Sequence, residues 1–435
     1  MRTRQRPRGD VPTVGVASIL DPALRLVLGE RPPVGLRFWD GTSIGPTDGD
    51  SVLIVRSPEA LRRLLYSPNE LGLGRAYVTG ELDVEGSIFG ALRLRDALGS
   101  PEDNVAVDLG SHFRWRLLLA MRKLGALGPP LPPPREEARL RGRLHSKERD
   151  AAAISHHYDV SNDFYRLVLG ESMTYSCGYY EKDDMTLNDA QRAKYDLIAR
   201  KLGLGAGMRL LDVGCGWGGM LLHAAEMYGV TAVGITLSRP QAELATERVH
   251  RAGLGEQIEV RVQDYRDLRG ERFDAISSIG MFEHVGAARL EAYFGSLFAA
   301  LEEGGRLLNH AISRPPHTGS NRHSFASRFV FPDGELQEVG SVVNAMQRGG
   351  FEVRDVESLR EHYGRTLRSW VANLERKWSE AQRLAGPGRA RVWRLYMAGS
   401  ALGFEAGRLN LHQVLAVKPR AGASGMPPTR ASLYA

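Results

Sequence analysis

The segment at residues 210–219 reads Leu-Leu-Asp-Val-Gly-Cys-Gly-Trp-Gly-Gly. Its apolar start, its acidic residue and its glycines predict a strand that ends in a tight turn and leads into a helix. Gly214 and Gly216 carry no side chain, so a ligand can lie directly against the backbone there. The first N–H groups of the following helix have no partners within the helix and point toward that ligand. The segment therefore predicts a ligand-binding loop.

Two classes of nucleotide cofactor compete for this loop. Three of its glycines fit the spacing of the dinucleotide fingerprint, which requires an acidic residue about 20 positions further on to hold the ribose. The strand expected at residues 230–235 is instead followed by Thr236, and the acid lies before the glycines, at Asp212. This arrangement resembles the first motif of S-adenosylmethionine (SAM) methyltransferases. A turn that serves packing alone explains it poorly, because four glycines in six residues are destabilising unless the backbone has a further role.

The composition bounds the class of protein. At 435 residues the chain is long enough for two domains, and its 43% hydrophobic and 25% charged residues are typical of a globular protein. The net charge of +6 and the isoelectric point of about 9.3 suit an anionic partner, although solubility explains them equally well. The two cysteines, Cys177 and Cys215, form no CxxC pattern, so we expect a reducing cytoplasm and neither a disulfide nor a zinc site. No apolar run reaches 18 residues, so we expect no membrane-spanning helix.

Changes in composition divide the chain into five segments. Residues 106–124 are expected to form a basic helix that carries Trp115, and such a helix either packs on its own domain or lies on a membrane surface. The five segments are a basic flexible arm (1–30), a small α+β domain for contact with lipid or a second copy (31–127), a proline-rich and then basic linker (128–149), a catalytic α/β domain (150–420) and a disordered tail (421–435).

Strand-like and helical segments alternate along the larger domain, which predicts a doubly wound, mostly parallel sheet. Because ligands bind at the carboxyl ends of such strands, we expect the motifs of the chain to meet there. Residues 313–340 interrupt the alternation, as a lid or a pocket wall would, and residues 361–406 are expected to be helical. The strands are expected at residues 208–213, 230–235, 257–262, 272–279 and 304–312, with a last one at 408–418.

Three further segments carry chemically distinctive residues. Residues 156–165 read His-His-Tyr-Asp-Val-Ser-Asn-Asp-Phe-Tyr, residues 175–177 read Tyr-Ser-Cys, and residues 281–286 read Met-Phe-Glu-His-Val-Gly. Together with the glycine loop, and in this order, they resemble cyclopropane-fatty-acyl-phospholipid synthases and the related mycolic acid cyclopropane synthases. The resemblance runs from about residue 156 to residue 417. Residues 71–77 show a fainter resemblance, to the phospholipid synthases alone.

The resemblance implies a Rossmann-like class I methyltransferase domain that acts on a cis double bond in a phospholipid acyl chain. In that family the double bond attacks the methyl group of SAM, and the resulting cation loses a proton to bound bicarbonate as a cyclopropane ring closes. The double bond is a weak nucleophile, so it must be held in line with the methyl group, and water must be excluded from the cation. The bicarbonate ligands that the resemblance implies are Cys177, Glu283, His310, the backbone of Ile312, and Tyr363.

Taken alone, these residues have ordinary structural explanations. A buried cysteine such as Cys177 is usually a small hydrophobe, Glu283 suits a helix start, and His310 fits a hydrogen-bonded core histidine. A nucleophilic pair of Cys177 and His310 also fits the residue types, although SAM chemistry needs no covalent enzyme intermediate. Glu283 and His310 favour a functional role because both follow strands at the edge where the ligand belongs.

The resemblance also implies which residues contact SAM. Gly214 and Gly216 would line the methionine end, and Asp212 would orient the loop or meet the ammonium group through water. The family also has threonine rather than an acid at the end of the second strand. The remaining contacts are Thr236, Leu237 and Gln241 beside the ribose and adenine, Gln263 and Asp264 beside adenine, and Tyr175 and Ser176 over the methionine carboxylate.

Four alternatives stay open. A sibling enzyme would leave a methylene branch on the same substrate; such siblings have an acid where this chain has Gly280, which favours ring closure. The others are a nicotinamide oxidoreductase, an inactive lipid-binding module and a small-molecule methyltransferase. Residues 329–334 depart from the Pro-Gly-Gly turn of relatives, which leaves the shape of the acyl pocket open.

The partners follow from the same resemblance. We expect unsaturated phospholipid acyl chains as the substrate, SAM and bicarbonate as cofactors, and no nucleic acid. The basic character of the chain suits peripheral contact with an anionic membrane, on the inner face of the cell membrane. A homodimer is a further expectation.

Overall fold

A computed structural model describes residues 15–97, 111–138, 142, 146, 149–150, 160–268, 270–316, 318 and 324–434. The chain divides into two compact units, Met1–Pro134 and Arg135–Ala435. This boundary lies within the linker expected at residues 128–149. Residues 156–159, which begin the first motif, and residues 1–14 of the expected arm lie outside the described residues.

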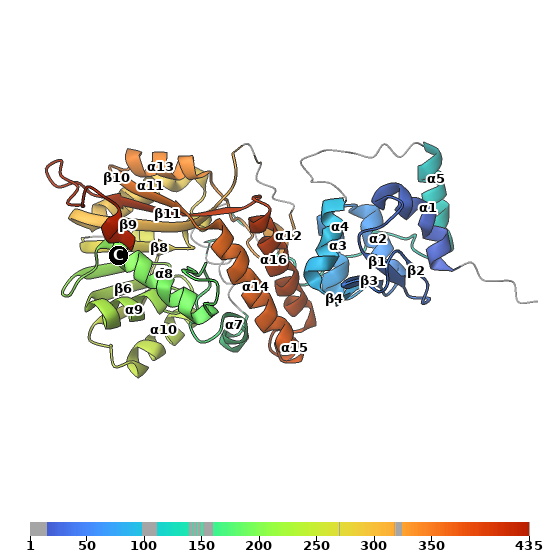
Figure 1. The fold of residues 1–435 in the computed structure, drawn as a ribbon, viewed down its shortest axis with the longest axis horizontal. Coiled ribbons are helices and arrows are strands. Elements are labelled where there is room, and N and C mark those ends of the chain that lie inside the picture. Colours follow the sequence, from blue (N-terminus) through green and yellow to red (C-terminus); the bar gives the residue numbers. More distant parts are fainter. Residues whose placement is uncertain are drawn as a thin grey trace, which may run out of the picture. The chain divides into compact units, whose positions relative to one another are not determined.

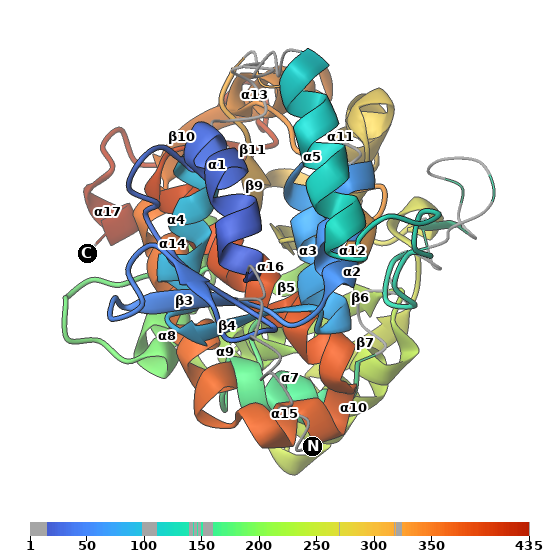
Figure 2. The same cartoon turned by 90° about the vertical axis from the view of Figure 1, so that its right-hand side faces the viewer.

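The first unit has a four-stranded sheet in the order β2-β1-β3-β4, in which β1 and β3 are parallel and the other neighbours antiparallel. The elements are α1 (Val16–Leu28), β1 (Gly35–Phe38), β2 (Ser43–Ile44), β3 (Ser51–Val55), α2 (Pro58–Tyr66), α3 (Glu70–Thr79), β4 (Leu82–Gly86), α4 (Ile88–Ala97) and α5 (Ser111–Lys123). Figure 2 shows α1 and α5 running side by side. The unit is therefore the small α+β domain that the sequence predicts.

Helix α1 lies where the sequence analysis expects a flexible arm. Val16, Leu20 and Leu28 are buried in the core of the first unit. The backbone N–H of Val16 also donates to Asp40 Oδ2 at 2.7 Å. The basic residues near the amino terminus suggest a loose arm, but apolar residues at helical spacing after residue 15 order this part of it.

The second unit is built on a seven-stranded sheet in the order β10-β11-β9-β8-β5-β6-β7 (Figure 1). Strands β5 to β9 are parallel, and β11 and β10 add an antiparallel edge. This order confirms the predicted doubly wound α/β fold. The strands are β5 (Arg209–Val213), β6 (Thr231–Thr236), β7 (Ile258–Val262), β8 (Phe273–Ile279), β9 (Leu301–Ser313), β10 (Glu352–Ser358) and β11 (Asn410–Val417).

Helices cover both faces of this sheet because successive residues of a strand point to opposite faces. Leu210 packs in one core cluster with helices α8 and α9, and Leu211 packs in the other with α11 and α13. Figure 1 shows these two pairs of helices on opposite sides of the strands. Their bounds are α8 (Leu187–Leu202), α9 (Gly219–Tyr228), α11 (Leu290–Ala300) and α13 (Val339–Arg348), with α10 (Arg239–Arg251) between β6 and β7.

A layer of helices closes the end of the sheet that carries the glycine loop. Tyr165 of α7 lies with its ring centroid 4.8 Å from that of Trp217 in the loop and 5.3 Å from that of Trp393 in α16. These aromatic contacts fix α7 and α16 over the carboxyl ends of the strands. The helices of this layer are α7 (Asn162–Leu169), α14 (Arg360–Arg376), α15 (Trp378–Ala385) and α16 (Pro387–Glu405).

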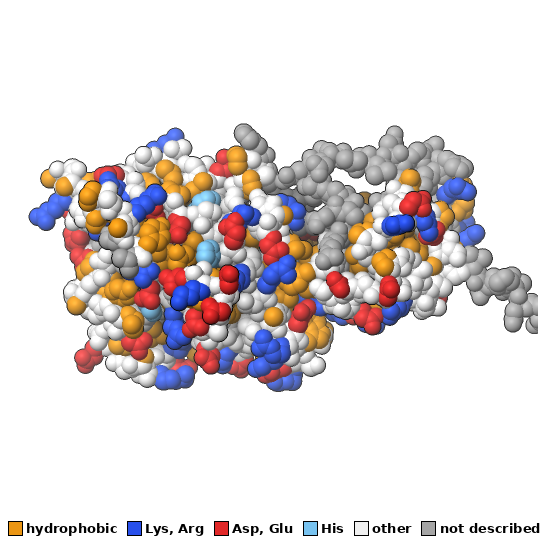
Figure 3. Space-filling view, in the orientation of Figure 1, with side chains coloured by type: hydrophobic (Ala, Val, Ile, Leu, Met, Phe, Trp, Pro, Cys, Tyr) orange, Lys and Arg blue, Asp and Glu red, His pale blue; other side chains and the backbone are white. Residues whose placement is uncertain are grey.

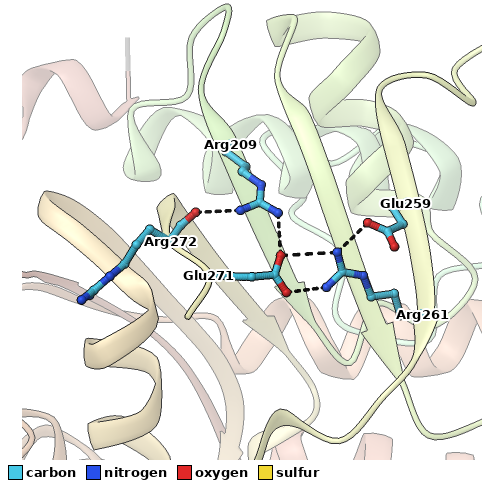
Figure 4. Close-up of polar contacts among 5 residues, drawn as sticks. All are labelled: Arg209, Glu259, Arg261, Glu271 and Arg272. Atoms are coloured by element: carbon cyan, nitrogen blue, oxygen red, sulfur yellow. Dashed lines mark hydrogen bonds and ion pairs between the residues drawn. The ribbon is translucent and has the colours of Figure 1, made fainter. Parts of the chain in front are cut away.

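Ion pairs link side chains of β5, β7 and the segment before β8 (Figure 4). Glu271, just before β8, accepts from Arg209 of β5 and from Arg261 of β7, each with an N···O distance of 2.6 Å. Arg261 also pairs with Glu259 at 2.6 Å. Hydrogen bonds to Arg261 are the main cause of the lowered pKa of Glu271. Basic and acidic side chains are interspersed over the face of this unit drawn in Figure 3.

Three further segments differ from the expected boundaries. Residues 325–329 form helix α12 (Phe325–Phe329) within the expected lid, with both phenylalanines buried. The expected disordered tail ends in helix α17 (Ala431–Tyr434), because Leu433 is buried and Arg430 pairs with Asp355 at 2.9 Å. The second unit begins at Arg135 rather than residue 150, since Glu137 is buried and pairs with Arg328. Among the described helices, none has both the length and the apolar character needed to cross a bilayer.

Candidate SAM and catalytic site

A cavity of about 1130 Å³, measured out to its open mouth, lies at the carboxyl ends of β5, β6 and β8. All the residues that the sequence analysis assigned to SAM line its wall. They are Tyr175, Ser176, Asp212, Gly214, Gly216, Thr236, Leu237, Gln241, Gln263 and Asp264. The structure thus brings segments that are far apart in the chain to one cavity, at the edge where a doubly wound sheet binds its ligand.

The glycine loop has a backbone that other residues would strain. Gly214 and Gly216 have φ values of +81° and +53°, in the left-handed region. A Cβ on Gly214 would lie 2.7 Å from Cβ of Met281 in the loop after β8. The N–H groups of Gly214 and Cys215 donate to the carbonyl of Ile235, at 2.9 and 3.0 Å. The loop is therefore held between β6 and the loop after β8, with its bare backbone on the cavity wall.

Asp212 is buried at the end of β5. Its Oδ1 accepts a hydrogen bond of 2.7 Å from the hydroxyl of Ser277 on β8. Burial raises the pKa of the carboxyl group to about 6. Ser277 fixes the direction of the carboxylate, so the group can orient the loop or receive an ammonium group.

The end of β6 carries neutral hydrogen-bonding groups. The hydroxyl of Thr236 donates to Oε1 of Gln241 at 2.9 Å and accepts from the backbone N–H of Ser238 at 3.2 Å. Ser238 caps α10 through the backbone N–H of Gln241, as the capping-box pattern indicates. Cofactor hydroxyl groups at this position would meet an amide and a hydroxyl group rather than an acid.

Asp264 differs from a free adenine-binding acid. Its Oδ1 accepts from the backbone N–H of Arg266 at 2.9 Å, and its Oδ2 pairs with the Arg266 guanidinium at 2.5 Å. Asp150 pairs with the same guanidinium at 3.2 Å. Asp150 and Arg266 also line the cavity, and the sequence analysis named neither of them. An acidic pair that shares one arginine is difficult to recognise from residues so far apart in the chain.

The Tyr-Ser-Cys segment is held by helix α8. Gln191 Nε2 donates to the carbonyl of Ser176 at 2.8 Å, and Lys194 Nζ donates to its hydroxyl at 2.9 Å. The ring of Tyr175 stacks on Trp370 with centroids 5.3 Å apart. Gln191 and Lys194 are both fully buried, and neither was expected from the sequence to belong to the site. Their spacing of three residues places them on one face of the helix.

The residues assigned to bicarbonate lie beside this cavity but do not line it. Glu283, in a short 3-10 turn after β8, accepts a hydrogen bond of 2.7 Å at Oε1 from the backbone N–H of Ile312. His310 lies in β9 opposite Ile279 of β8, and its carbonyl accepts from the N–H of Gly280, which does line the cavity. The N–H of Ile312 therefore has a partner within the protein.

Burial shifts Glu283 and His310 toward their neutral forms. Burial raises the pKa of Glu283 to about 7 and lowers that of His310 well below its usual range. Nδ1 of His310 lies 3.3 Å from Nε2 of Gln413. Among the described residues, Oε2 of Glu283 and Nε2 of His310 have no hydrogen-bond partner although both atoms are buried. Such atoms normally have partners, so they favour a bound polar ligand.

Cys177 is a buried thiol. Its Sγ donates to the carbonyl of Gly178 at 3.1 Å, and the carbonyl of Leu359 lies 3.8 Å away. The backbone N–H of Tyr363 donates to the same Leu359 carbonyl at 3.2 Å. Burial raises the pKa of Cys177, so the group stays protonated and is a poor nucleophile.

A parallel sheet with this glycine loop, no acid at the end of β6, and an edge of buried neutral groups define a SAM-dependent methyltransferase rather than a nicotinamide enzyme. Comparison with known proteins gives the family. The model of the mycolic acid cyclopropane synthetase family matches residues 145–414. The chain belongs to the cyclopropane synthase family of SAM-dependent methyltransferases.

The similar proteins share most of their length with this chain. A probable fatty acid methyltransferase of Pseudomonas putida is 42% identical over 416 residues, which cover 92% of this chain and 96% of that protein. The cyclopropane-fatty-acyl-phospholipid synthase of Escherichia coli (strain K12) is 32% identical over 362 residues, or 83% of this chain and 86% of that protein. A mycolic acid cyclopropane synthase crystallised with SAH and CTAB has 36% identity and a TM-score of 0.58, covering 61% of this chain and 97% of that chain.

We predict that Gly214→Ala weakens binding of S-adenosylhomocysteine (SAH) by at least about tenfold, because a left-handed alanine costs roughly 1–3 kcal/mol and its Cβ would clash with Met281. Isothermal titration calorimetry measures the effect. Gly205→Ala is the matched control, since nothing lies within 4 Å of a Cβ at Gly205. Equal affinity of Gly214→Ala and wild type would show that the loop does not approach the cofactor.

Proposed function

We propose that the protein transfers a methylene group from SAM to a cis double bond of a phospholipid acyl chain and closes a cyclopropane ring, with bicarbonate as the base. The observation that carries this proposal is the pair of buried, unpartnered atoms beside the SAM cavity, Glu283 Oε2 and His310 Nε2. They offer hydrogen bonds to a small ligand at the edge of the sheet where the methyl group of SAM would be delivered.

The residues present fit a small oxyanion. The Cys177 thiol is protonated, and Glu283, with a pKa of about 7, can hold a proton at Oε2. If Nδ1 of His310 accepts from Gln413, its Nε2 carries the hydrogen and donates. Glu283 and His310 can thus offer two neutral donors to an anion, and the Cys177 thiol would be a third if its hydrogen turned away from the Gly178 carbonyl. SAM would supply the methyl group, and bicarbonate would accept the proton released on ring closure.

The wall beside this site excludes water. Tyr165, Trp217, Trp370 and Trp393 are all buried, and the contacts among these rings and Tyr175 join α7, the glycine loop, α14 and α16. A carbocation reacts rapidly with water, so a dry aromatic wall favours controlled loss of a proton. Aromatic faces also stabilise a nearby positive charge. Tyr363, with its ring centroid 4.7 Å from that of Phe404, extends this wall.

The alternative product is a methyl or methylene branch on the same acyl chain. Two relatives 42% identical to this chain are named probable fatty acid methyltransferases, from Pseudomonas putida and Mycobacterium tuberculosis, so this product has support of its own. Gly280 favours ring closure, because branch-forming siblings have an acid there, and its φ of +68° disfavours any larger residue.

Expression in a bacterial host that lacks cyclopropane lipids, with labelled methionine, tests the product. We expect labelled phospholipids whose acyl chains gain one CH2 and lose their olefinic proton signals. Labelled chains that keep an olefinic proton would show the methylene-branched product, and label absent from phospholipids would exclude phospholipid as the substrate. Unlabelled methionine with the same plasmid is the control.

If Glu283 and His310 hold the base, changing either residue should reduce turnover without weakening binding of the cofactor. Glu283→Gln keeps an acceptor for the Ile312 N–H but cannot relay the proton that bicarbonate accepts on ring closure, so we expect turnover to fall by at least about 100-fold. His310→Ala is expected to have a similar effect, while the Kd for SAH stays within about threefold in both variants. His223→Ala, which removes a pair with Asp196 of α8, is the control. Unchanged turnover in either site variant would refute the bicarbonate assignment.

We further propose that the first unit binds the anionic inner face of the cell membrane through α5. Trp115, Leu118, Leu119 and Arg122 follow helical spacing, so they share one face, and all are exposed. The opposite face, with Met121, packs in the core of this unit. An exposed face of tryptophan, leucine and arginine suits an interfacial helix. A membrane contact of this kind would place the protein in the cytoplasm, and this location is part of the proposal. The expected homodimer remains a prediction.

Binding to vesicles of phosphatidylethanolamine and phosphatidylglycerol tests this surface. We expect the double variant Trp115→Ala, Leu119→Ala to bind at least about tenfold more weakly, because two exposed apolar side chains that would enter the lipid are lost. Added salt is expected to weaken wild-type binding by screening the attraction to anionic lipid. Met227→Ala removes an exposed apolar side chain of α9 and is the control. Salt-independent binding would contradict the electrostatic part of the proposal, and full binding by the double variant would exclude α5.

A further inference from the structure

Lys194 is a buried lysine on the wall of the SAM cavity. Its side chain is 0% exposed, and the cavity wall beside it includes Ser176 and Asp212. Among the described residues, its Nζ donates to Ser176 Oγ at 2.9 Å and forms no ion pair with a carboxylate. An ammonium group removed from water needs an opposite charge, and the protein part of this site supplies none in direct contact.

Helix α8 fixes both Lys194 and its hydroxyl partner. Gln191, one turn earlier, donates from Nε2 to the carbonyl of Ser176, while Lys194 donates to its Oγ. A hydroxyl group that accepts from an ammonium keeps its own hydrogen for another acceptor. Lys194 and Ser176 together therefore offer the cavity donors but no negative charge.

The other ionisable groups around Lys194 are neutral or more distant. Burial keeps the Cys177 thiol and the Tyr195 phenol protonated and His310 uncharged. Asp212 attracts Lys194 without forming an ion pair, and its own pKa is raised to about 6. Burial lowers the pKa of Lys194 to about 7, so without a ligand beside it the amine would be close to half protonated at neutral pH.

The methionine end of SAM brings a carboxylate, an ammonium and a sulfonium group. Of these, the carboxylate alone is complementary to a lysine. We propose that Lys194, together with the Ser176 hydroxyl, binds the carboxylate of SAM and of the product SAH. This inference rests on SAM as the cofactor and is independent of the lipid substrate and of the base proposed above.

The proposed contact between Lys194 and the carboxylate is tested by removing the charge from the ligand and from the lysine in turn. Titration calorimetry compares SAH with its decarboxylated analogue on wild type and on Lys194→Met. We expect wild type to prefer SAH by at least about tenfold, and Lys194→Met to bind the two ligands within about threefold of one another, because the partner of the carboxylate is gone. Methionine removes a buried amine, so the variant is expected to remain folded. A Lys194→Met variant that still prefers SAH as strongly as wild type would overturn the assignment.

A matched control separates the effect of the Lys194 charge from the effect of holding the Tyr-Ser-Cys segment in place. Gln191→Leu removes the other contact from α8 to Ser176 but keeps the ammonium. We expect it to weaken both ligands by a similar factor, so that its preference for SAH equals that of wild type. Loss of that preference in Gln191→Leu would mean that Lys194 acts only by holding Ser176, which would also overturn the proposal.

Proton uptake provides a readout that a merely structural lysine would not change. A carboxylate beside Lys194 raises the pKa of the amine, so SAH binding should draw a proton onto it, and more fully at about pH 8 than at about pH 6, where the free amine is already charged. Titrations in buffers of different ionisation enthalpy count these protons. We expect wild type to take up at least about half a proton more than Lys194→Met at pH 8. Equal uptake by the two proteins would refute a contact between Lys194 and the carboxylate.

Discussion

The site depends on a backbone that passes too closely between two neighbours to carry a side chain. After β5 the chain turns through Gly214, whose N–H donates to the carbonyl of Ile235 and whose α-carbon faces Met281. This contact joins the ends of β5 and β6 to the loop after β8. Because these ends are held together, Asp212, Thr236 and Gly280 reach one cavity. The cofactor site is thus a property of the sheet edge rather than of the loop alone.

The parallel strands explain why Glu283 and His310, the residues proposed to hold the base, lie next to the cofactor cavity. β8 and β9 are parallel and in register, with Ile279 opposite His310. The chain leaves β8 at Gly280, on the cavity wall, and returns Glu283 to accept from Ile312 two residues beyond His310. An acid from the turn after β8 and an imidazole from β9 therefore lie at the same edge of the sheet, with no long loop between them. Strand β11, the antiparallel neighbour of β9, adds Gln413, whose Nε2 lies 3.3 Å from Nδ1 of the imidazole ring.

The sequence predicts well those features that depend on local pattern. The glycine loop and the alternation of strands and helices each depend on adjacent residues, so the sheet and the residues on its cavity wall follow from them. Strand β10 was missed because it lies at the edge of the sheet, with charged residues such as Glu352, Arg354 and Asp355 in place of an apolar run. Helix α17 was missed because the burial of Leu433 depends on distant partners.

Buried lysines show more clearly that the sequence does not reveal contacts between residues far apart in the chain. Lys194 and Lys201 lie in α8, and the pattern there is that of a solvated helix surface, yet both side chains are fully buried. Lys201 is paired with Asp355 and Glu357, more than 150 positions further along the chain. No local pattern marks such a lysine. The two lysines differ in their partners. Lys201 forms ion pairs with carboxylates of the described protein, whereas the polar partner of Lys194 is the neutral hydroxyl group of Ser176.

One cause, removal of water, sets the electrostatics of the whole site. It raises the pKa of Glu283 and of Cys177, and it lowers the pKa of His310 and of Lys194. The acids and bases at the edge of the sheet are thus shifted toward their neutral forms, and charge enters with the ligands. In the proposed reaction a sulfonium donor and a carbocation would then meet aromatic faces and fixed dipoles, and the ammonium of Lys194 would be offset by the carboxylate that it is proposed to bind. The same dryness that protects a cation from water therefore also limits the positive charge that would repel it.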